Sequence, residues 1–205
     1  MRGRARLLLA IFLLPALLAA CAAGCRMPLR EMPYALNHQI AQVPTAGMSP
    51  AIRPGYHVAI KVGYYDERPV RRFDIVAYRQ RPENLAVMGE WDEETISLGR
   101  VIGLGGEKVE FRDGRVFVNG RLLEEPFETV PYGPPDPQRD PGRPVVHVPP
   151  DEYLLLGDNR PDSYDGRYWE MPTLHKRYIH GKVVEIFPHK DAAPAPTPQP
   201  PRFQN

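Results

Sequence analysis

The segment KVEFRDGRVFVNG constrains the fold more than any other part of this chain. Its Asp-Gly pair at 113–114 is the favoured two-residue loop of a β-hairpin, because both loop positions need a positive φ. A loop of this length pairs Phe111 with Val116 and Val109 with Val118. Side chains alternate between the two faces of a strand, so these four apolar residues share one face. The segment therefore predicts an antiparallel hairpin with one buried face.

Short apolar runs separated by turn signals make up most of the remaining chain, and no long stretch has the 3.6-residue period of a helix. These runs predict strands at residues 57–62, 73–79, 95–104, 107–112, 115–120, 152–158 and 181–187. A chain of 205 residues can bury the core of one ordinary domain. We expect a mostly β, antiparallel domain over residues 26–190.

Proline dominates two segments. Residues 126–150 contain nine prolines, which remove hydrogen-bond donors and disfavour regular strands, so we expect a long surface excursion or a small lobe there. Residues 191–205, DAAPAPTPQPPRFQN, have the composition of a disordered or polyproline tail.

The first 25 residues, MRGRARLLLAIFLLPALLAACAAGC, have the composition of a targeting segment. Three arginines precede an apolar run from Leu7 to Ala20 that ends in small residues. This run is shorter than the roughly 20 residues that a membrane-spanning helix needs. Residues 1–25 are therefore set apart from the folded domain.

Cys21 is the candidate site of lipid attachment in this segment. The sequence LAAC, which ends at Cys21, resembles a bacterial lipoprotein signal, in which cleavage precedes a cysteine that then carries the lipid. An uncleaved membrane anchor and a plain secretory signal are the alternatives. Lipidation and anchoring both predict a chain tethered to a membrane on its extracytoplasmic side, in a bacterial cell envelope.

Charge and cysteine content exclude several classes of site. The chain has 26 basic and 25 acidic residues, so no basic surface predicts nucleic-acid binding. Cys21 and Cys25 are the only cysteines, and the folded part therefore contains no internal disulfide. No motif predicts a metal or a cofactor. The oligomeric state is left open.

Four stretches resemble, in order, the successive conserved boxes of type I signal peptidases, the bacterial leader peptidases. They are VPTAGMSPAIRPGYHVAI, RRFDIVAYR, GRVIGLGGEKVEFRDGRVFVNG and VPPDEYLLLGDNRPDSYDGRYW, and the resemblance covers residues 43–187. It implies a mostly antiparallel β fold, a membrane anchor, a serine nucleophile and a lysine base.

The resemblance also implies where these two catalytic residues would lie. The nucleophile of the family directly precedes the Met of the Met-x-Pro turn, and the base directly precedes the Arg of RVIG; here these positions are Gly47 and Gly99. A hydroxyl needs an adjacent base with a depressed pKa, and glycine supplies neither group. Arg100 cannot replace the lysine, because a guanidinium stays protonated. The chain is therefore predicted to lack the catalytic dyad.

Other parts of the family's site are retained. By resemblance, Thr45 occupies the position of a hydroxyl that helps to form the oxyanion hole, and Ser163 that of the serine that supports the lysine. Met48 and Pro50 keep the shape of the turn. The polar frame of the site comprises Asp158, Asn159, Arg160, Asp165 and Arg167. An alternative interpretation is that this frame only caps a buried turn and pairs its charges.

A relocated nucleophile is the second alternative. The chain has three serines, Ser49, Ser97 and Ser163, and in an extended segment Ser49 would share a face with position 47. Its candidate base is His57, with Lys61 and Lys108 as the nearest lysines in sequence to position 99. A turn serine before Pro50 and a surface histidine are the simpler explanation.

Three functions remain open. The favoured hypothesis is a non-catalytic protein that holds extended peptides at an exposed strand edge, with signal peptides, envelope proteins or a true peptidase as candidate partners. The second is an active signal peptidase with a relocated nucleophile or with a base lent by another subunit. The third is a structural lipoprotein in which the fold is only a scaffold.

Overall fold

The computed structural model describes residues 37–84, 95–130 and 144–189. Chain contacts divide the protein into two compact units, Met1–Asn37 and His38–Asn205, and the strands lie in the second unit. The predictions for residues 1–25, including Cys21, for residues 191–205 and for most of the proline-rich segment fall outside the described residues. Within these ranges no helix is long and apolar enough to cross a membrane.

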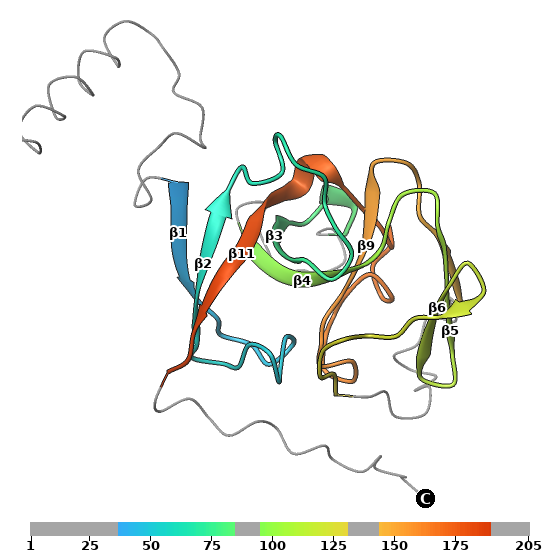
Figure 1. The fold of residues 1–205 in the computed structure, drawn as a ribbon, viewed down its shortest axis with the longest axis horizontal. Coiled ribbons are helices and arrows are strands. Elements are labelled where there is room, and N and C mark those ends of the chain that lie inside the picture. Colours follow the sequence, from blue (N-terminus) through green and yellow to red (C-terminus); the bar gives the residue numbers. More distant parts are fainter. Residues whose placement is uncertain (1–36, 85–94, 131–143, 190–205) are drawn as a thin grey trace, which may run out of the picture. The chain divides into compact units, whose positions relative to one another are not determined.

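Antiparallel strands build the domain, as the sequence predicted (Figure 1). A seven-stranded sheet has the order β1-β2-β11-β3-β4-β9-β10, and a four-stranded sheet has the order β7-β6-β5-β8, both within the described part of the chain. In chain order the strands are β1 His38–Gln42, β2 His57–Val62, β3 Ile75–Arg79, β4 Ile96–Gly103, β5 Lys108–Arg112, β6 Arg115–Val118, β7 Arg121–Leu122, β8 Val145–His147, β9 Glu152–Leu156, β10 Leu174–His175 and β11 Ile179–Phe187. A short 3-10 helix, Lys176–Tyr178, precedes β11.

The predicted hairpin is β5–β6, and its register is confirmed. Phe111 pairs with Val116 and Val109 with Val118, and the loop residues Asp113 and Gly114 have φ values of 50° and 72°. Val109 and Val116 are buried in a cluster that also contains Ile102 of β4 and Leu154 of β9. The apolar face of the hairpin therefore packs on strands of the larger sheet.

Four strands were not predicted: β7 and β10 are only two residues long, and β1 and β8 have sequences that look unlike strands. β1, HQIAQ, is an edge strand whose side chains are mostly exposed, so burial imposes no alternating pattern on it. β8 lies inside the proline-rich segment and pairs with β5 at the other sheet's edge. Pro144 still contributes there, since its carbonyl accepts a bond from the Phe111 N–H.

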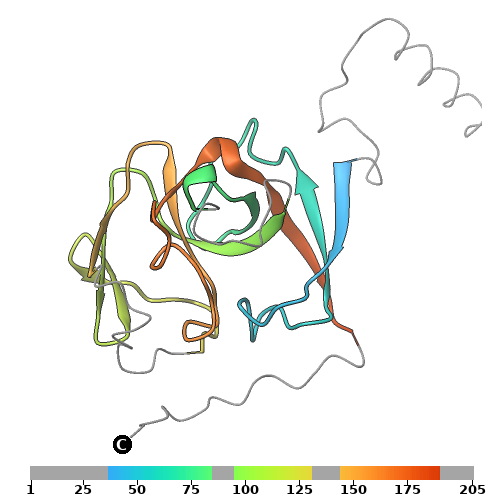
Figure 2. The same cartoon turned by 180° about the vertical axis from the view of Figure 1, so that it is seen from behind.

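The core around β3 and β4 positions the site. Trp169 is fully buried and contacts Tyr78 of β3, with 5.6 Å between the ring centroids. Ile52, Val58 and Ile60 form a second cluster, together with Met48, on the other side of the sheet. Viewed from behind, β4 curves away from β3 toward β9 (Figure 2). Its first half therefore has β3 as a partner, and β9 pairs only from Arg100 onward.

Candidate functional site

Gly47 lies in a compact turn that connects β1 to β2. The Val43 N–H donates to the Tyr56 carbonyl at the base of this turn, and the Ser49 N–H donates to the Ala46 carbonyl inside it. Ser49–Pro50 is a cis peptide bond. Residues 45–50 form bends and turns, so the extended geometry in which Ser49 would share a face with position 47 does not occur.

A cavity of about 350 Å³ separates this turn from the start of β4. Gly47 and Gly99, the predicted nucleophile and base positions, both line it, and so do Thr45 and Ser163. The rest of its wall is mostly apolar and includes Met48, Val58, Ile60, Ile96, Leu98 and Leu155. The fold thus brings together residues from distant sequence motifs around one pocket.

The two glycines differ in the space around them. A Cβ added at Gly47 would meet Ser163 Cβ at 3.6 Å, which is an ordinary contact distance. A Cβ added at Gly99 would lie 3.2 Å from Tyr78 Cε1 and 3.3 Å from Leu155 Cβ. Position 47 can therefore accept a side chain as it stands, whereas position 99 is already packed by its neighbours.

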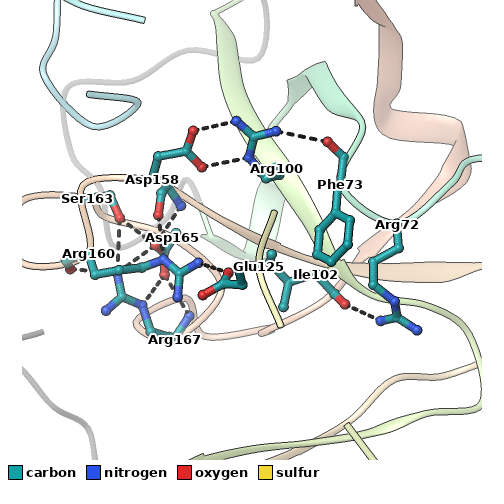
Figure 3. Close-up of polar contacts among 11 residues, drawn as sticks. Arg72, Phe73, Arg100, Ile102, Glu125, Asp158, Arg160, Ser163, Asp165 and Arg167 are labelled. Atoms are coloured by element: carbon teal, nitrogen blue, oxygen red, sulfur yellow. Dashed lines mark hydrogen bonds and ion pairs between the residues drawn. The ribbon is translucent and has the colours of Figure 1, made fainter. Parts of the chain in front are cut away.

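Asp165 and Arg167 form the buried centre of the polar frame (Figure 3). Arg167 Nε donates to Asp165 Oδ1 at 2.6 Å, and Arg167 Nη2 donates to Oδ2 at 2.7 Å. The Ser163 hydroxyl donates to the same carboxylate and accepts a bond from Arg167 Nη2 at 3.0 Å. Ser163 is thereby held at the pocket wall beside Gly47.

Asp158 pairs with Arg100, which directly follows Gly99. Arg100 Nε donates to Asp158 Oδ1 at 2.7 Å, and Nη2 donates to Oδ2 at 2.6 Å. The third nitrogen, Nη1, donates to the Phe73 carbonyl at 3.0 Å. Both side chains of the pair are buried. This bidentate ion pair connects the middle of β4 to the loop that carries the polar frame.

Asn159 holds the Gly47 turn by its backbone. The Asn159 N–H donates to the Gly47 carbonyl at 3.0 Å, and its side-chain amide donates to the Ala46 carbonyl at 3.2 Å. Gly157 approaches the turn so closely that a Cβ there would lie 2.5 Å from the Gly47 carbonyl oxygen. The two Asn159 hydrogen bonds and the close contact at Gly157 therefore fix the position of the turn.

The sequence matches the family described as "Signal peptidase, peptidase S26" over residues 12–188. This chain belongs to that family. The retained frame and the two glycine positions are thus features of a signal peptidase S26 member.

Curated relatives carry signal peptidase names. The chain is 34% identical over 138 residues to "Probable signal peptidase I-2" of Synechocystis, with 65% of this chain and 56% of the relative covered. It is 35% identical over 145 residues to "Signal peptidase I" of Leptolyngbya laminosa, with 71% and 66% covered. It therefore spans less than two thirds of the length of these relatives.

A solved structure, a signal peptidase I from Enterococcus faecalis, is 27% identical in sequence and has a TM-score of 0.41 to this chain. The alignment covers 57% of this chain and 98% of the solved one.

In this S26 member, Tyr78 of β3 and Ser97 of β4 lie on paired strands close to Gly99. They are register partners, both line the pocket, and a hydrogen bond joins their side chains. Burial raises the pKa of the Tyr78 hydroxyl, and the negative charge of Asp165 adds to this effect. Tyr78 was not singled out from the sequence, because a tyrosine in a buried strand has no local mark of a pocket residue.

The candidates for a relocated nucleophile and base lie elsewhere. Ser49 is fully buried, and its hydroxyl has no hydrogen-bond partner within the described ranges. Neither Ser49 nor His57 lines the pocket. Lys61 and Lys108 are also absent from its lining, and Lys108 pairs with Glu110 at 2.6 Å. The described part of the chain contains no cluster of three or more side chains that could hold a metal ion.

The start of the proline-rich segment packs on the polar frame, which the sequence did not predict. Phe127 lies under the Arg100 guanidinium, with 3.9 Å from Cζ to the ring centroid. Glu125 forms an ion pair with Arg160, and the Val130 N–H donates to the Asp158 carbonyl at 3.0 Å. Phe127 and Val130, at the start of this segment, thus contact the polar frame, and Glu125 just before it does so as well.

Proposed function

We propose that this protein is a signal peptidase relative that binds extended peptides without cleaving them. The observation that carries the proposal is the pocket beside Gly47 and Gly99, which combines an open cavity with the absence of side chains at both dyad positions. A peptide held there would meet the oxyanion-side Thr45 but no hydroxyl and no amine at the dyad positions. Binding would then persist without the chemistry that follows it.

An edge of β4 without a described partner strand supports binding of an extended ligand. Along Ile96–Gly99, β4 pairs with β3 on one side, and no described strand pairs with its other edge. The pocket is lined by these same residues. An added peptide strand could bond to this edge and place its side chains in the pocket, which is the usual mode of β-strand addition.

Tethering to a membrane on its extracytoplasmic side is part of the proposal. It rests on the apolar segment before Cys21, by lipidation of that cysteine or by an uncleaved anchor. In that location the candidate ligands are signal peptides and other secreted or envelope proteins. Mass spectrometry of the mature amino terminus would distinguish lipidated Cys21 from a retained anchor.

A cleavage assay tests whether the protein is non-catalytic. The full chain in detergent micelles is incubated with a preprotein that has an Ala-x-Ala cleavage site, and the expected result is no processing. Processing that disappears in Ser49→Ala would overturn the proposal and establish a relocated nucleophile. The burial of Ser49 argues against that outcome.

Restoring the dyad tests whether the rest of the pocket can still support cleavage. The double variant Gly47→Ser with Gly99→Lys is expected to gain some processing activity, because Thr45 and Ser163 both line the same pocket. The crowding of position 99 by Tyr78 and Leu155 predicts that this activity stays far below that of an active family member. Gly47→Ser alone, without the lysine base, serves as the inactive control.

Crosslinking separates peptide binding from a purely structural role. An extended signal-peptide analogue with a photoreactive side chain should label residues of β4 or of the 43–55 turn. A protein that serves only as a scaffold would show no labelling that unlabelled peptide can compete away.

A further inference from the structure

We infer that the pocket selects an extended peptide with a lysine between two apolar residues, the lysine on one face of β4 and the apolar side chains on the other. This inference rests on the proposed function and specifies its ligand. It follows from the two faces of the free β4 edge and from the groups that line each of them.

The first step is the alternation of side chains along this edge. Ser97 lies opposite Tyr78, and Gly99 lies opposite Val76, so these residues share one face of the sheet. Ile96 and Leu98 belong to the other face, where they pack against the cluster around Ile60. An added strand would point successive side chains to these two faces in turn.

The apolar face suits two large aliphatic side chains. Besides Ile96 and Leu98, its part of the pocket wall contains Met48, Val58 and Ile60. Side chains at positions i and i+2 of the ligand strand would both contact this wall. Leucine at each position would bury apolar area there without an unpaired polar group.

The three hydroxyls of Ser163, Tyr78 and Ser97 at the opposite face offer more hydrogen-bond acceptor sites than donors. The Ser163 hydroxyl uses its proton on Asp165 and one lone pair on Arg167, which leaves one lone pair for a ligand. Tyr78 and Ser97 share one hydrogen bond, so together they retain three lone pairs and one proton. A ligand group at i+1 should therefore be a donor.

Charge favours an ammonium group as that donor. Among the described residues that line the pocket, Asp162 and Asp165 are acidic, Asp165 being paired with Arg167, and none is a lysine, arginine or histidine. A lysine side chain supplies three donors and no acceptor, and its long apolar stem can pass the β4 edge. Position 99 contributes no side chain of its own here, because it is glycine. The ligand would thus bring an ammonium group to a pocket whose described lining has none.

Matched peptides test this inference on the full chain in detergent micelles. Short fluorescein-labelled peptides contain Leu-Xaa-Leu with Xaa as Lys, Met, Gln or Glu, and fluorescence anisotropy measures their dissociation constants. We expect the Lys peptide to bind at least about tenfold more tightly than the Met peptide, which has a similar length but no charge. The Glu peptide should bind most weakly.

Variants of the pocket hydroxyls test which groups cause the preference for the Lys peptide. Tyr78→Phe, Ser97→Ala and Ser163→Ala each remove hydroxyl groups on the acceptor-rich face, and each should move the Lys-to-Met affinity ratio toward one. Tyr65→Phe is the matched control; Tyr65 is buried and bonds Asp74, but it does not line the pocket, so the ratio should stay as in the parent protein. Circular dichroism checks that each variant is folded. Ser97→Ala is the smallest change, so it still tests the inference if Tyr78→Phe does not fold.

The outcomes separate the two proposals. Peptide binding with no preference for Lys over Met and Gln overturns this inference and leaves the proposed function standing. A Lys preference that all three hydroxyl variants retain also overturns it. No binding by any peptide overturns the proposed function, and this inference with it.

Discussion

The polar frame and the two glycine positions lie around one pocket but differ in how the protein uses them. The frame contains buried charges in bidentate pairs, Arg167 with Asp165 nearby in sequence and Asp158 with the distant Arg100. Gly47 and Gly99 contribute only backbone, one with room for a side chain and one without. The difference teaches that the frame can be maintained by the stability of the fold alone, whether or not a catalytic dyad is present.

Removal of one partner from a buried pair should have the largest effect. Asp158→Ala leaves the Arg100 guanidinium buried without its carboxylate, and we expect a loss of about 3–5 kcal/mol in the free energy of unfolding. Urea denaturation measures it. Arg115→Ala, at an exposed position on the hairpin, is the control and should change stability by no more than about 0.5 kcal/mol. A loss in Asp158→Ala as small as in the control would contradict a structural role for the frame.

The glycines should respond to alanine with opposite signs. At Gly99 the added methyl group meets Tyr78 and Leu155, so we expect Gly99→Ala to destabilise the protein by about 1–3 kcal/mol. At Gly47 the contact is ordinary, and Gly47→Ala should stabilise by about 0.4–1 kcal/mol because the unfolded chain loses freedom. Thermal unfolding of both variants tests this. Equal shifts would show that the two sites do not differ in packing.

Loss of the Asn159 side chain should have an intermediate effect. Asn159→Ala removes the bond to the Ala46 carbonyl but keeps the backbone bond to Gly47, and we expect a cost of about 1 kcal/mol. The turn should also become more mobile, which amide hydrogen exchange at residues 45–50 would detect. Unchanged exchange there would mean that the backbone bond alone holds the turn.

A polar contact away from the frame provides the smallest effect. Burial, and secondarily the charge of Arg79, lowers the pKa of His180, whose ring bonds Gln39. Below its ordinary pKa of 6.5 the unfolded chain binds more protons at this site than the folded chain does. His180 therefore contributes a loss of stability as the pH falls from above 6.5 toward the lowered pKa.

Comparison with His180→Gln isolates this contribution. Urea denaturation of both proteins at pH 5.5 and pH 7.5 should give a smaller drop at low pH for the variant, since glutamine does not titrate. An equal drop in both proteins would assign the pH dependence to other groups.

Local chemistry determined several features from the sequence alone. The Asp113-Gly114 loop specified the β5–β6 hairpin and its register, because a two-residue loop leaves one pairing that buries the apolar side chains together. The order of the family motifs identified Gly47 and Gly99, since these positions are defined by their neighbours in the chain. The antiparallel β class followed from the short apolar runs in the same way.

Tertiary structure alone decided which of these residues meet. Ser49, two positions from Gly47, is buried outside the pocket because the segment turns, while Tyr78 and Leu155 pack on Gly99 from other strands. Phe127 contacts Arg100 from a segment whose prolines predicted an excursion, and Glu125, just before that segment, pairs with Arg160. Sequence patterns report the preferences of adjacent residues, whereas burial and packing depend on which distant strands the topology makes neighbours.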